Sequence, residues 1–195
     1  MKKVTTENKI IMAANKLFAQ KGYSATTTRD IAKEAGTNLA LINYHFGSKE
    51  NLYKKVVREK LMILIGAMGP ILSDEEISLE EKIESIVGNY TTLLLENEEL
   101  PIFILSELTV NKEFFVDITQ NTRQLAQPVI DKQLNEREID LSAVDLIINT
   151  LSLTMFPFVA KPLITTSGLI KDEGFIDFVT ERKKKILEWI LKTTK

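Results

Sequence analysis

The stretch TTRDIAKEAGTNLALINYHFGSK, residues 27–49, decides the fold expected for this chain. Thr27 and Asp30 have the spacing of a capping box, in which each side chain bonds the backbone of the other residue at a helix start. Gly36 supplies a tight turn, and a second short helix is expected from about Asn38. Two short helices joined by a glycine-containing turn are typical of a DNA-binding helix-turn-helix.

Three further positions agree with that spacing. When Thr28 is counted as the first position, the motif places a small residue fifth, a glycine ninth and an apolar residue fifteenth. The chain supplies Ala32, Gly36 and Ile42 there. Ala32 lets the two helices cross closely, and Ile42 fills the wedge between them. A helical hairpin without function would match one such position by chance, but three matches behind a capping box favour DNA binding.

The composition is that of a globular protein with a substantial core. The 195 residues are 44% hydrophobic and 27% charged, and the absence of cysteine excludes disulfides and thiol chemistry. Nothing at the start resembles a signal peptide. The longest apolar run, residues 61–72, is interrupted by two glycines and a proline and is too short to cross a bilayer. We therefore expect a cytoplasmic protein that does not use a membrane.

The net charge of −2 hides a strong asymmetry. Residues 1–60 contain 12 Lys/Arg and 5 Asp/Glu, which gives +7, whereas residues 61–195 contain 13 Lys/Arg and 22 Asp/Glu, which gives −9. The basic part coincides with the helix-turn-helix. That distribution is expected if the first part meets a phosphate backbone and the acidic remainder stays away from it.

Apolar periodicity predicts helices along the whole chain and no strand. The first helix is expected over residues 6–20, ended by Gly22, and the fourth is expected over residues 48–68, capped by Ser48. Prolines in the later helices are expected to bend or end them. These later helices are expected over residues 79–95, 101–109, 113–136 (with Pro128), 141–164 (with Pro157 and Pro162) and 175–191.

These elements predict an all-α fold of about nine helices. Residues 1–47 are expected to form a three-helix, helix-turn-helix DNA-binding head. Residues 48–195 are expected to form a helical ligand-sensing and dimerisation body, which begins with the long connecting helix.

The residues LFAQKGYSATTTRDIAKEAG (17–36) and INYHFGSKENL (42–52) resemble the TetR family of transcriptional regulators. The resemblance is strong over residues 9–60, and the remaining 135 residues match in length, helicity and order of elements. Membership would imply a homodimer, a palindromic operator in double-stranded DNA and a small-molecule effector that releases the DNA. It would also imply that the last two long helices form a four-helix bundle with those of the partner subunit.

The second helix of the motif is expected to read bases. Asn43 is the best candidate, because its amide can pair with the edge of adenine in the major groove. Leu39 lies inward on the helical wheel with Ile42 and Phe46, yet the matching family position often meets bases, so both alternatives stay open. The expected DNA-binding residues are Thr27, Thr28, Arg29, Asn38, Leu39, Ala40, Leu41, Asn43, Tyr44, His45 and Lys49.

The family pattern and this chain differ at two of these positions. Many relatives have a small or hydroxylated residue in place of Leu41 and a tyrosine in place of Asn43, so an operator sequence cannot be transferred from them. His45 is the only histidine of the chain. No triad or metal-site partner accompanies it in the sequence, so contact with phosphate is favoured over catalysis.

The body is expected to hold both a ligand pocket and a dimer interface. The candidate pocket residues are Leu61, Met62, Ile65, Phe103, Glu107, Phe115, Met155, Phe156 and Phe158. The candidate interface residues are Ile147, Leu151, Phe178, Ile186 and Trp189. At helical spacing, Met and Phe are more often plain core than pocket lining, and both sets have intrachain core as their alternative.

The function expected from these features is that of a ligand-responsive repressor, released from DNA by a small, largely apolar effector. A transcriptional activator, or a helical interaction module with a vestigial DNA-binding head, remains as the alternative. An enzyme is not expected, because the sequence has no phosphate-binding loop, dinucleotide-binding glycine pattern, metal-ligand cluster or nucleophile–base pair. No cofactor and no metal ion are expected.

Overall fold

A computed structural model describes residues 5–66, 68–110 and 112–192. These residues form α-helices joined by turns, with one short 3₁₀ turn, η1 (Asp172–Gly174). The expected all-α fold of about nine helices is confirmed, with α5 as an additional helix of little more than one turn. In chain order the α-helices are α1 (Thr6–Ala25), α2 (Thr28–Glu34), α3 (Leu39–Phe46), α4 (Lys49–Gly66), α5 (Gly69–Ser73), α6 (Leu79–Glu96), α7 (Leu100–Val110), α8 (Glu113–Glu136), α9 (Ala143–Thr166) and α10 (Phe175–Lys192).

The chain divides into two compact units, Met1–Lys60 and Leu61–Lys195. The helix α4 begins in the first unit, and its last six residues belong to the second. The predicted functional division, into a DNA-binding head of residues 1–47 and a sensing body of residues 48–195, stays a prediction.

The first unit is built around a small apolar core between α1, α2, α3 and the start of α4. Residues from all four helices are fully buried in it, among them Ile10, Ile31, Ile42 and Leu52. The glycine expected to end the first helix does so locally: Gly22 leaves the helical conformation, with φ of 76° and ψ of 167°, and one more turn follows before α1 ends. A positive φ is accessible to glycine at little cost.

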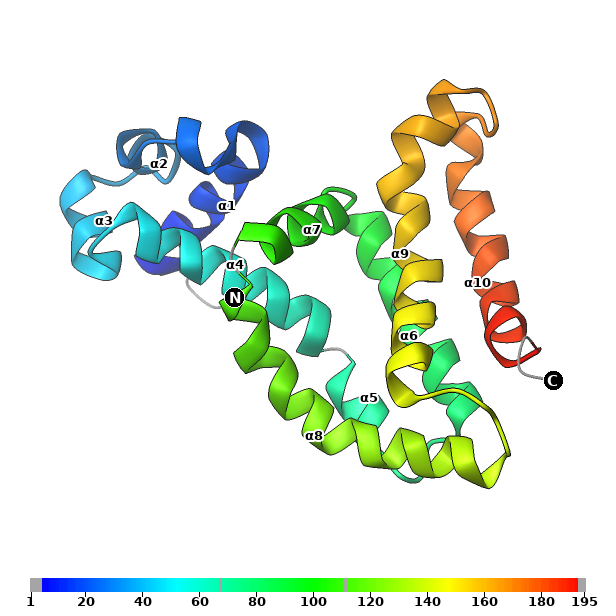
Figure 1. The fold of residues 1–195 in the computed structure, drawn as a ribbon. Helices are drawn as coiled ribbons and strands as arrows, with labels where there is room; N and C mark the ends of the chain where they lie inside the picture. The colour runs from blue at the N-terminus through cyan, green and yellow to red at the C-terminus, as the bar shows by residue number, and fades with distance from the viewer. Residues whose placement is uncertain (1–4, 67, 111, 193–195) are drawn as a thin grey trace. The chain divides into compact units, whose positions relative to one another are not determined.

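The second unit has α6, α9 and α10 packed against one another, with α7 and α8 also contacting α9 (Figure 1). The short helix α5 packs against α8. Buried apolar residues of α6, including Ile83, Ile86 and Leu94, form the centre of this unit together with Leu146 of α9 and Ile186 of α10.

The prolines were expected to bend or end the later helices. The helices continue through them, so ending is wrong, and bending stays a prediction. Pro157 lies inside the single helix α9. A proline in a helix leaves the carbonyl four residues earlier without its usual N–H donor. Here the Leu153 carbonyl accepts a hydrogen bond from Nη2 of Arg182 on α10, at 3.3 Å. A donor from another helix thus replaces the missing bond. The helix α9 also continues through Pro162, and α8 through Pro128.

Within the described residues, α9 is the one helix long and apolar enough to cross a membrane by length and composition, with a mean hydropathy of 1.6 in its most apolar window. Core helices of globular proteins pass the same test. In this fold α9 packs against α6, α7, α8 and α10, so we interpret it as a core helix.

The Tyr90 hydroxyl, on α6, donates a hydrogen bond to a carbonyl at the end of α4. The last four carbonyls of a helix have no donor within the helix itself. Leu64, in the last turn of α4, receives instead a hydrogen bond from the buried Tyr90 hydroxyl, while the Ile65 carbonyl accepts from the Met68 N–H at 3.0 Å. Burial raises the pKa of Tyr90 far above its usual value, so the hydroxyl remains a donor at neutral pH.

Candidate nucleic-acid interface and effector cavity

The helix α3 is held in place by the residues that the motif spacing identified. Ile42 is completely buried, and Ala32 of α2 is 6% exposed, as expected of a wedge between two closely crossing helices. Gly36, in the turn between them, has a φ of 62°, a conformation that residues with a Cβ rarely adopt. These features fix one side of α3 against the core and leave its other side to solvent.

The exposed side of α3 carries most of the residues expected to meet DNA. Ala40, Asn43, Tyr44 and His45 are exposed, and Leu41 is half-buried. The inward position considered for Leu39 is wrong, because its side chain is 37% exposed. Leu39 is the first residue of α3, where the helix has just begun, and the core contacts start with Ile42.

Both motif helices begin at side chains that cap them. Thr27 accepts a hydrogen bond from the Asp30 N–H at 3.1 Å, and the Asp30 carboxylate accepts bonds from the Thr27 hydroxyl and N–H, so the predicted capping box is confirmed. The hydroxyl bond from Thr27 holds the pKa of Asp30 below its usual value. In the same way, Asn38 accepts from the Leu41 N–H at 2.9 Å. Thr27 and Asn38 therefore have structural roles in addition to any contact with DNA.

The start of α2 also presents polar side chains to solvent. Thr28 is half-buried, and Arg29 is exposed next to it. Helix N-termini favour anions through their free N–H groups and their dipole, and a cation adds to that attraction. This end of α2 has the chemistry for a phosphate group of the DNA backbone.

Lys49 has a structural role that the sequence did not reveal. Its ammonium group donates hydrogen bonds to the carbonyls of Tyr23 at 2.9 Å and Thr26 at 3.0 Å, and it lies 4.1 Å from the centre of the Tyr23 ring. These contacts tie the start of α4 to the last turn of α1 and to Thr26, which follows it. An ammonium group has three N–H donors, so one remains for a phosphate contact.

The second unit contains an apolar cavity of about 590 Å³, within the range typical of small-molecule sites, roughly 300–1,000 Å³. Its walls come from α4 to α9. The lining residues are Leu64, Ile65, Met68, Leu72, Tyr90, Ile104, Leu105, Leu108, Phe115, Thr119, Thr122, Arg123, Ala126, Gln127, Ala143, Val144, Ile147, Ile148, Leu151, Ser152, Met155, Phe156 and Val159.

Four of the nine candidate pocket residues line this cavity: Ile65, Phe115, Met155 and Phe156. The other five, Leu61, Met62, Phe103, Glu107 and Phe158, do not. Leu61 is completely buried in the core, Met62 is 51% exposed, and Phe158 packs edge-on against Phe175 with 5.4 Å between ring centroids. The helical wheel identified apolar faces but not which neighbour each face meets.

Two candidate interface residues also belong to the cavity. Ile147 and Leu151 line it within their own chain, as part of the α9 wall. Of the other three, Ile186 is buried in the intrachain core at 1% exposure, Phe178 is half-buried, and Trp189 is 39% exposed beneath the guanidinium of Arg182.

The sequence interpretation missed the polar side of the cavity. Thr119, Thr122, Arg123 and Gln127 line it from α8. Thr119, Arg123 and Gln127 recur every four residues, and Thr122 follows Thr119 by three, which places them near one face of the helix. The sequence contains this spacing, but polar residues on one face of a helix usually indicate a face exposed to solvent, so no cavity was inferred from it.

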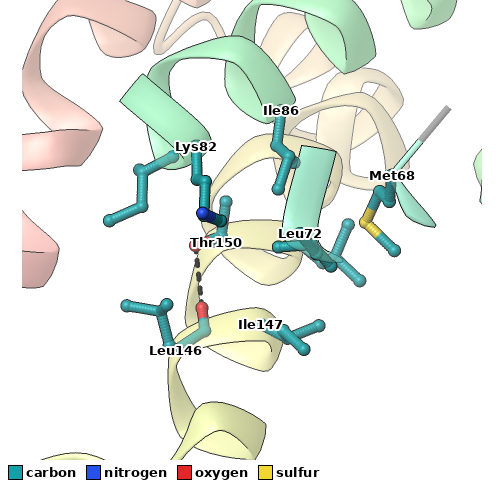
Figure 2. A pocket seen from close by; sticks show the side chains of 9 residues that line it. Met68, Leu72, Lys82, Ile86, Leu146, Ile147 and Thr150 are labelled. Atoms are coloured by element: carbon teal, nitrogen blue, oxygen red, sulfur yellow. Dashed lines mark hydrogen bonds between the residues drawn. The ribbon is translucent and has the colours of Figure 1, made fainter. Parts of the chain in front are cut away.

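Next to the large cavity lies a much smaller void, of about 10 Å³ (Figure 2), large enough for roughly one water molecule at most. Figure 2 shows Lys82 beside it, and the Thr150 hydroxyl donating to the Leu146 carbonyl at 2.7 Å. Lys82 is fully buried, which lowers the pKa of its ammonium group, and it donates to the carbonyls of Asp74 and Ile77 between α5 and α6. This void is part of the packing and not a ligand site.

Among the described residues, no three His, Asp or Glu side chains come together as a metal site would require. The only histidine, His45, lies on exposed α3, 5.2 Å from Tyr44 between ring centroids.

Comparisons with known proteins agree with the geometry of the first unit. Residues 10–56 match the family described as bacterial regulatory proteins, tetR family. The chain is 28% identical to the probable HTH-type transcriptional regulator YttP of Bacillus subtilis, over 84% of this chain and 82% of that protein. It is 33% identical to the HTH-type transcriptional repressor KstR2 of Mycolicibacterium smegmatis, over 58% of this chain and 62% of that one.

Among solved structures, the fold is similar to that of a TetR-family transcription regulator from Shewanella sp. PV-4, with a TM-score of 0.68 and 18% identity over 97% of both chains. A TetR-like transcriptional regulator from Rhodococcus sp. RHA1 gives a TM-score of 0.59 at 16% identity, covering 96% of this chain and 98% of the other. The similarity therefore extends over both units of the fold.

Proposed function

We propose that the chain, which belongs to the TetR family of helix-turn-helix transcriptional regulators and is not an enzyme, is a cytoplasmic, ligand-responsive repressor. It binds a palindromic operator as a homodimer and is released by a small, largely apolar effector. The observation that carries this proposal is the cavity of about 590 Å³ in the same chain as an exposed α3. Repression is supported by the similarity to KstR2, which is a transcriptional repressor.

The proposed DNA contacts divide into two groups. Asn43 reads a base edge in the major groove, while Leu39, Ala40 and Leu41 offer apolar contact to thymine methyl groups. Contacts with phosphate oxygens fix the position of the protein on the duplex without reading sequence. That second group consists of Thr27, Thr28, Arg29, Asn38, Tyr44, His45 and Lys49.

A homodimer is proposed because one short α3 covers few base pairs. Two such helices, separated by one helical turn of DNA or a multiple of it, would bind a symmetric site with useful affinity. The surface proposed for the interface lies on α9 and α10, where large apolar side chains remain exposed in the single chain. Examples are Leu163 at 71%, Ile176 at 59% and Trp189 at 39% exposure.

The proposed coupling between effector and DNA runs along α4. Leu52 and Val56 of this helix belong to the core of the first unit, and Leu64 and Ile65 line the cavity of the second. An effector that displaces the cavity end of α4 would bias the spacing of the two DNA-binding heads. By linkage, the loss in DNA affinity equals the preference of the effector for the non-binding state, typically ~1–3 kcal/mol.

The test is selection from a random DNA pool by the purified full chain, followed by sequencing of the retained DNA. An enriched inverted repeat supports a dimeric regulator. Retention without sequence preference, or no retention by folded protein, would refute it and favour an interaction module with a vestigial head. A reporter placed behind the selected operator then separates repression from activation by the sign of the change on deleting the regulator.

A further inference from the structure

We propose that the cavity binds a single-chain amphiphile with an anionic head group, a carboxylate or a phosphate monoester, and that Arg123 holds the head group. The regulatory consequence of this binding rests on the function proposed above, but the binding itself does not. The inference follows from the unequal chemistry of the two longest walls of the cavity.

The wall formed by α9 is apolar along almost its whole length. It presents Ile147, Leu151, Met155 and Phe156, with Ser152 as its polar residue. These side chains are mostly flexible or branched aliphatic groups, which adapt to a methylene chain. An extended hydrocarbon chain laid along this wall would be transferred from water to an apolar surface, and the gain grows with each methylene that is buried.

The facing wall, formed by α8, is polar in the stretch from Thr119 to Gln127. Arg123 is the one charged side chain among the described residues that line the cavity. Its Nε donates to Oε1 of Gln127 at 3.0 Å, which fixes the guanidinium plane relative to α8. The two terminal amino groups of an arginine carry the other four N–H donors, in a planar fork that matches a carboxylate or a phosphate.

An anion fits the electrostatics of this arrangement. Arg123 lines the cavity and is also exposed to solvent, so its guanidinium can meet a head group at the edge of the cavity while the hydrocarbon chain lies inside. A neutral ligand there would cover part of the guanidinium without providing a counter-charge, whereas an anionic head group would form a charge-assisted bidentate contact with it. The long apolar wall and the single cation therefore select together for an amphiphilic anion.

The primary experiment is calorimetric titration of the full chain, below the micelle concentration of each ligand, with octanoate, decanoate, dodecanoate, dodecyl phosphate and 1-dodecanol. The anions are expected to bind with one molecule per protomer. Affinity should rise about fourfold for each methylene added. Loss of the charged head group in 1-dodecanol should weaken binding at least about tenfold. The two dodecyl anions show which head group is preferred.

Variants identify the residue responsible. Arg123→Gln should lose about tenfold or more in affinity for dodecanoate and leave 1-dodecanol unaffected, and Arg123→Lys should retain part of the binding. Lys132→Gln is the matched control, because Lys132 is an exposed cation on the same helix outside the lining. Leu151→Trp should narrow the cavity and weaken the binding of all these ligands. Unchanged circular dichroism will show that each variant is folded.

The proposal is overturned if dodecanoate and 1-dodecanol bind equally, if Arg123→Gln and Lys132→Gln weaken binding equally, or if no anion binds. Its failure is distinct from failure of the proposed function. Operator binding without amphiphile binding refutes this inference alone. Saturable, Arg123-dependent amphiphile binding that leaves operator affinity unchanged supports this inference and refutes the proposed release mechanism.

Discussion

Replacing Tyr90 with phenylalanine tests whether the end of α4 depends on a donor from α6. The substitution removes one oxygen from a side chain that is 1% exposed and leaves the rest of its packing in place. The Leu64 carbonyl then loses the Tyr90 hydroxyl bond at a helix end, where the described Met68 N–H bonds the Ile65 carbonyl instead. A buried acceptor left without a donor costs ~1–3 kcal/mol.

For a chain of this length, such a loss lowers the melting temperature by roughly 2–4 °C for each kcal/mol. We therefore expect Tyr90→Phe to melt about 2–12 °C below the unmodified protein. The measurement is thermal unfolding followed by circular dichroism, with a urea titration at the same protein concentration, because dimerisation would make both transitions depend on concentration. The urea slope should stay the same, since the surface exposed on unfolding does not change.

Tyr44→Phe is the matched control. It removes the same atom from a tyrosine that is 82% exposed, so its melting temperature should not change. If Tyr90→Phe melts together with Tyr44→Phe, the hydroxyl does not stabilise the end of α4 and the reasoning is wrong. A changed urea slope would instead indicate that the substitution alters the compactness of one of the two states.

Four other substitutions test the proposed DNA contacts and the observed contacts at the helix ends. Asn43→Ala should lose ~1–3 kcal/mol of binding free energy only on operators with the preferred base at one position of each half-site. Arg29→Ala should weaken binding to all sequences. If both variants weaken binding equally on every sequence in a competition assay, Asn43 does not read a base. Lys49→Met should lower the free energy of unfolding by about 2 kcal/mol, because two carbonyls lose a charged donor, and an unchanged urea midpoint would count against it. The pKa of Asp30 is lowered in the folded state, so its capping box stabilises the fold above the ordinary pKa near 3.8. This stabilisation is lost as the pH falls through the lowered pKa. Thr27→Ala removes the capping partner, so the variant should lose less stability than the unmodified protein on acidification between pH 6 and pH 3.

The first unit could be predicted well because its determinants are local. The capping box at Thr27, the turn at Gly36 and the wedge at Ile42 each depend on residues a few positions apart, and the structure confirms all three. Both alternatives stayed open for Leu39 because a helical wheel does not show where a helix begins, whereas in the structure the core contacts of α3 start only after its first residues.

The cavity could be predicted only in part because it depends on which helices face one another. Ile65, Phe115, Met155 and Phe156 line it, since each lies on an apolar face of a helix that reaches the cavity, and their contact with a ligand stays a prediction. Apolar periodicity could not show that Phe158 packs instead on Phe175, or that Arg123, although exposed, lines the cavity from the polar face of α8. Those outcomes are set by contacts between helices distant in the sequence.

The hydrogen bond from Arg182 to the Leu153 carbonyl has a consequence for the order in which the chain folds. Until α10 is present, α9 contains a proline and a carbonyl without a donor, at a point flanked by cavity-lining residues of the same helix. During synthesis from the N-terminus, the α9 wall of the cavity would therefore lack the Arg182 hydrogen bond until residues near the end of the chain had emerged from the ribosome. A protein truncated before Arg182 would keep every lining residue of the cavity and still lack a stable wall.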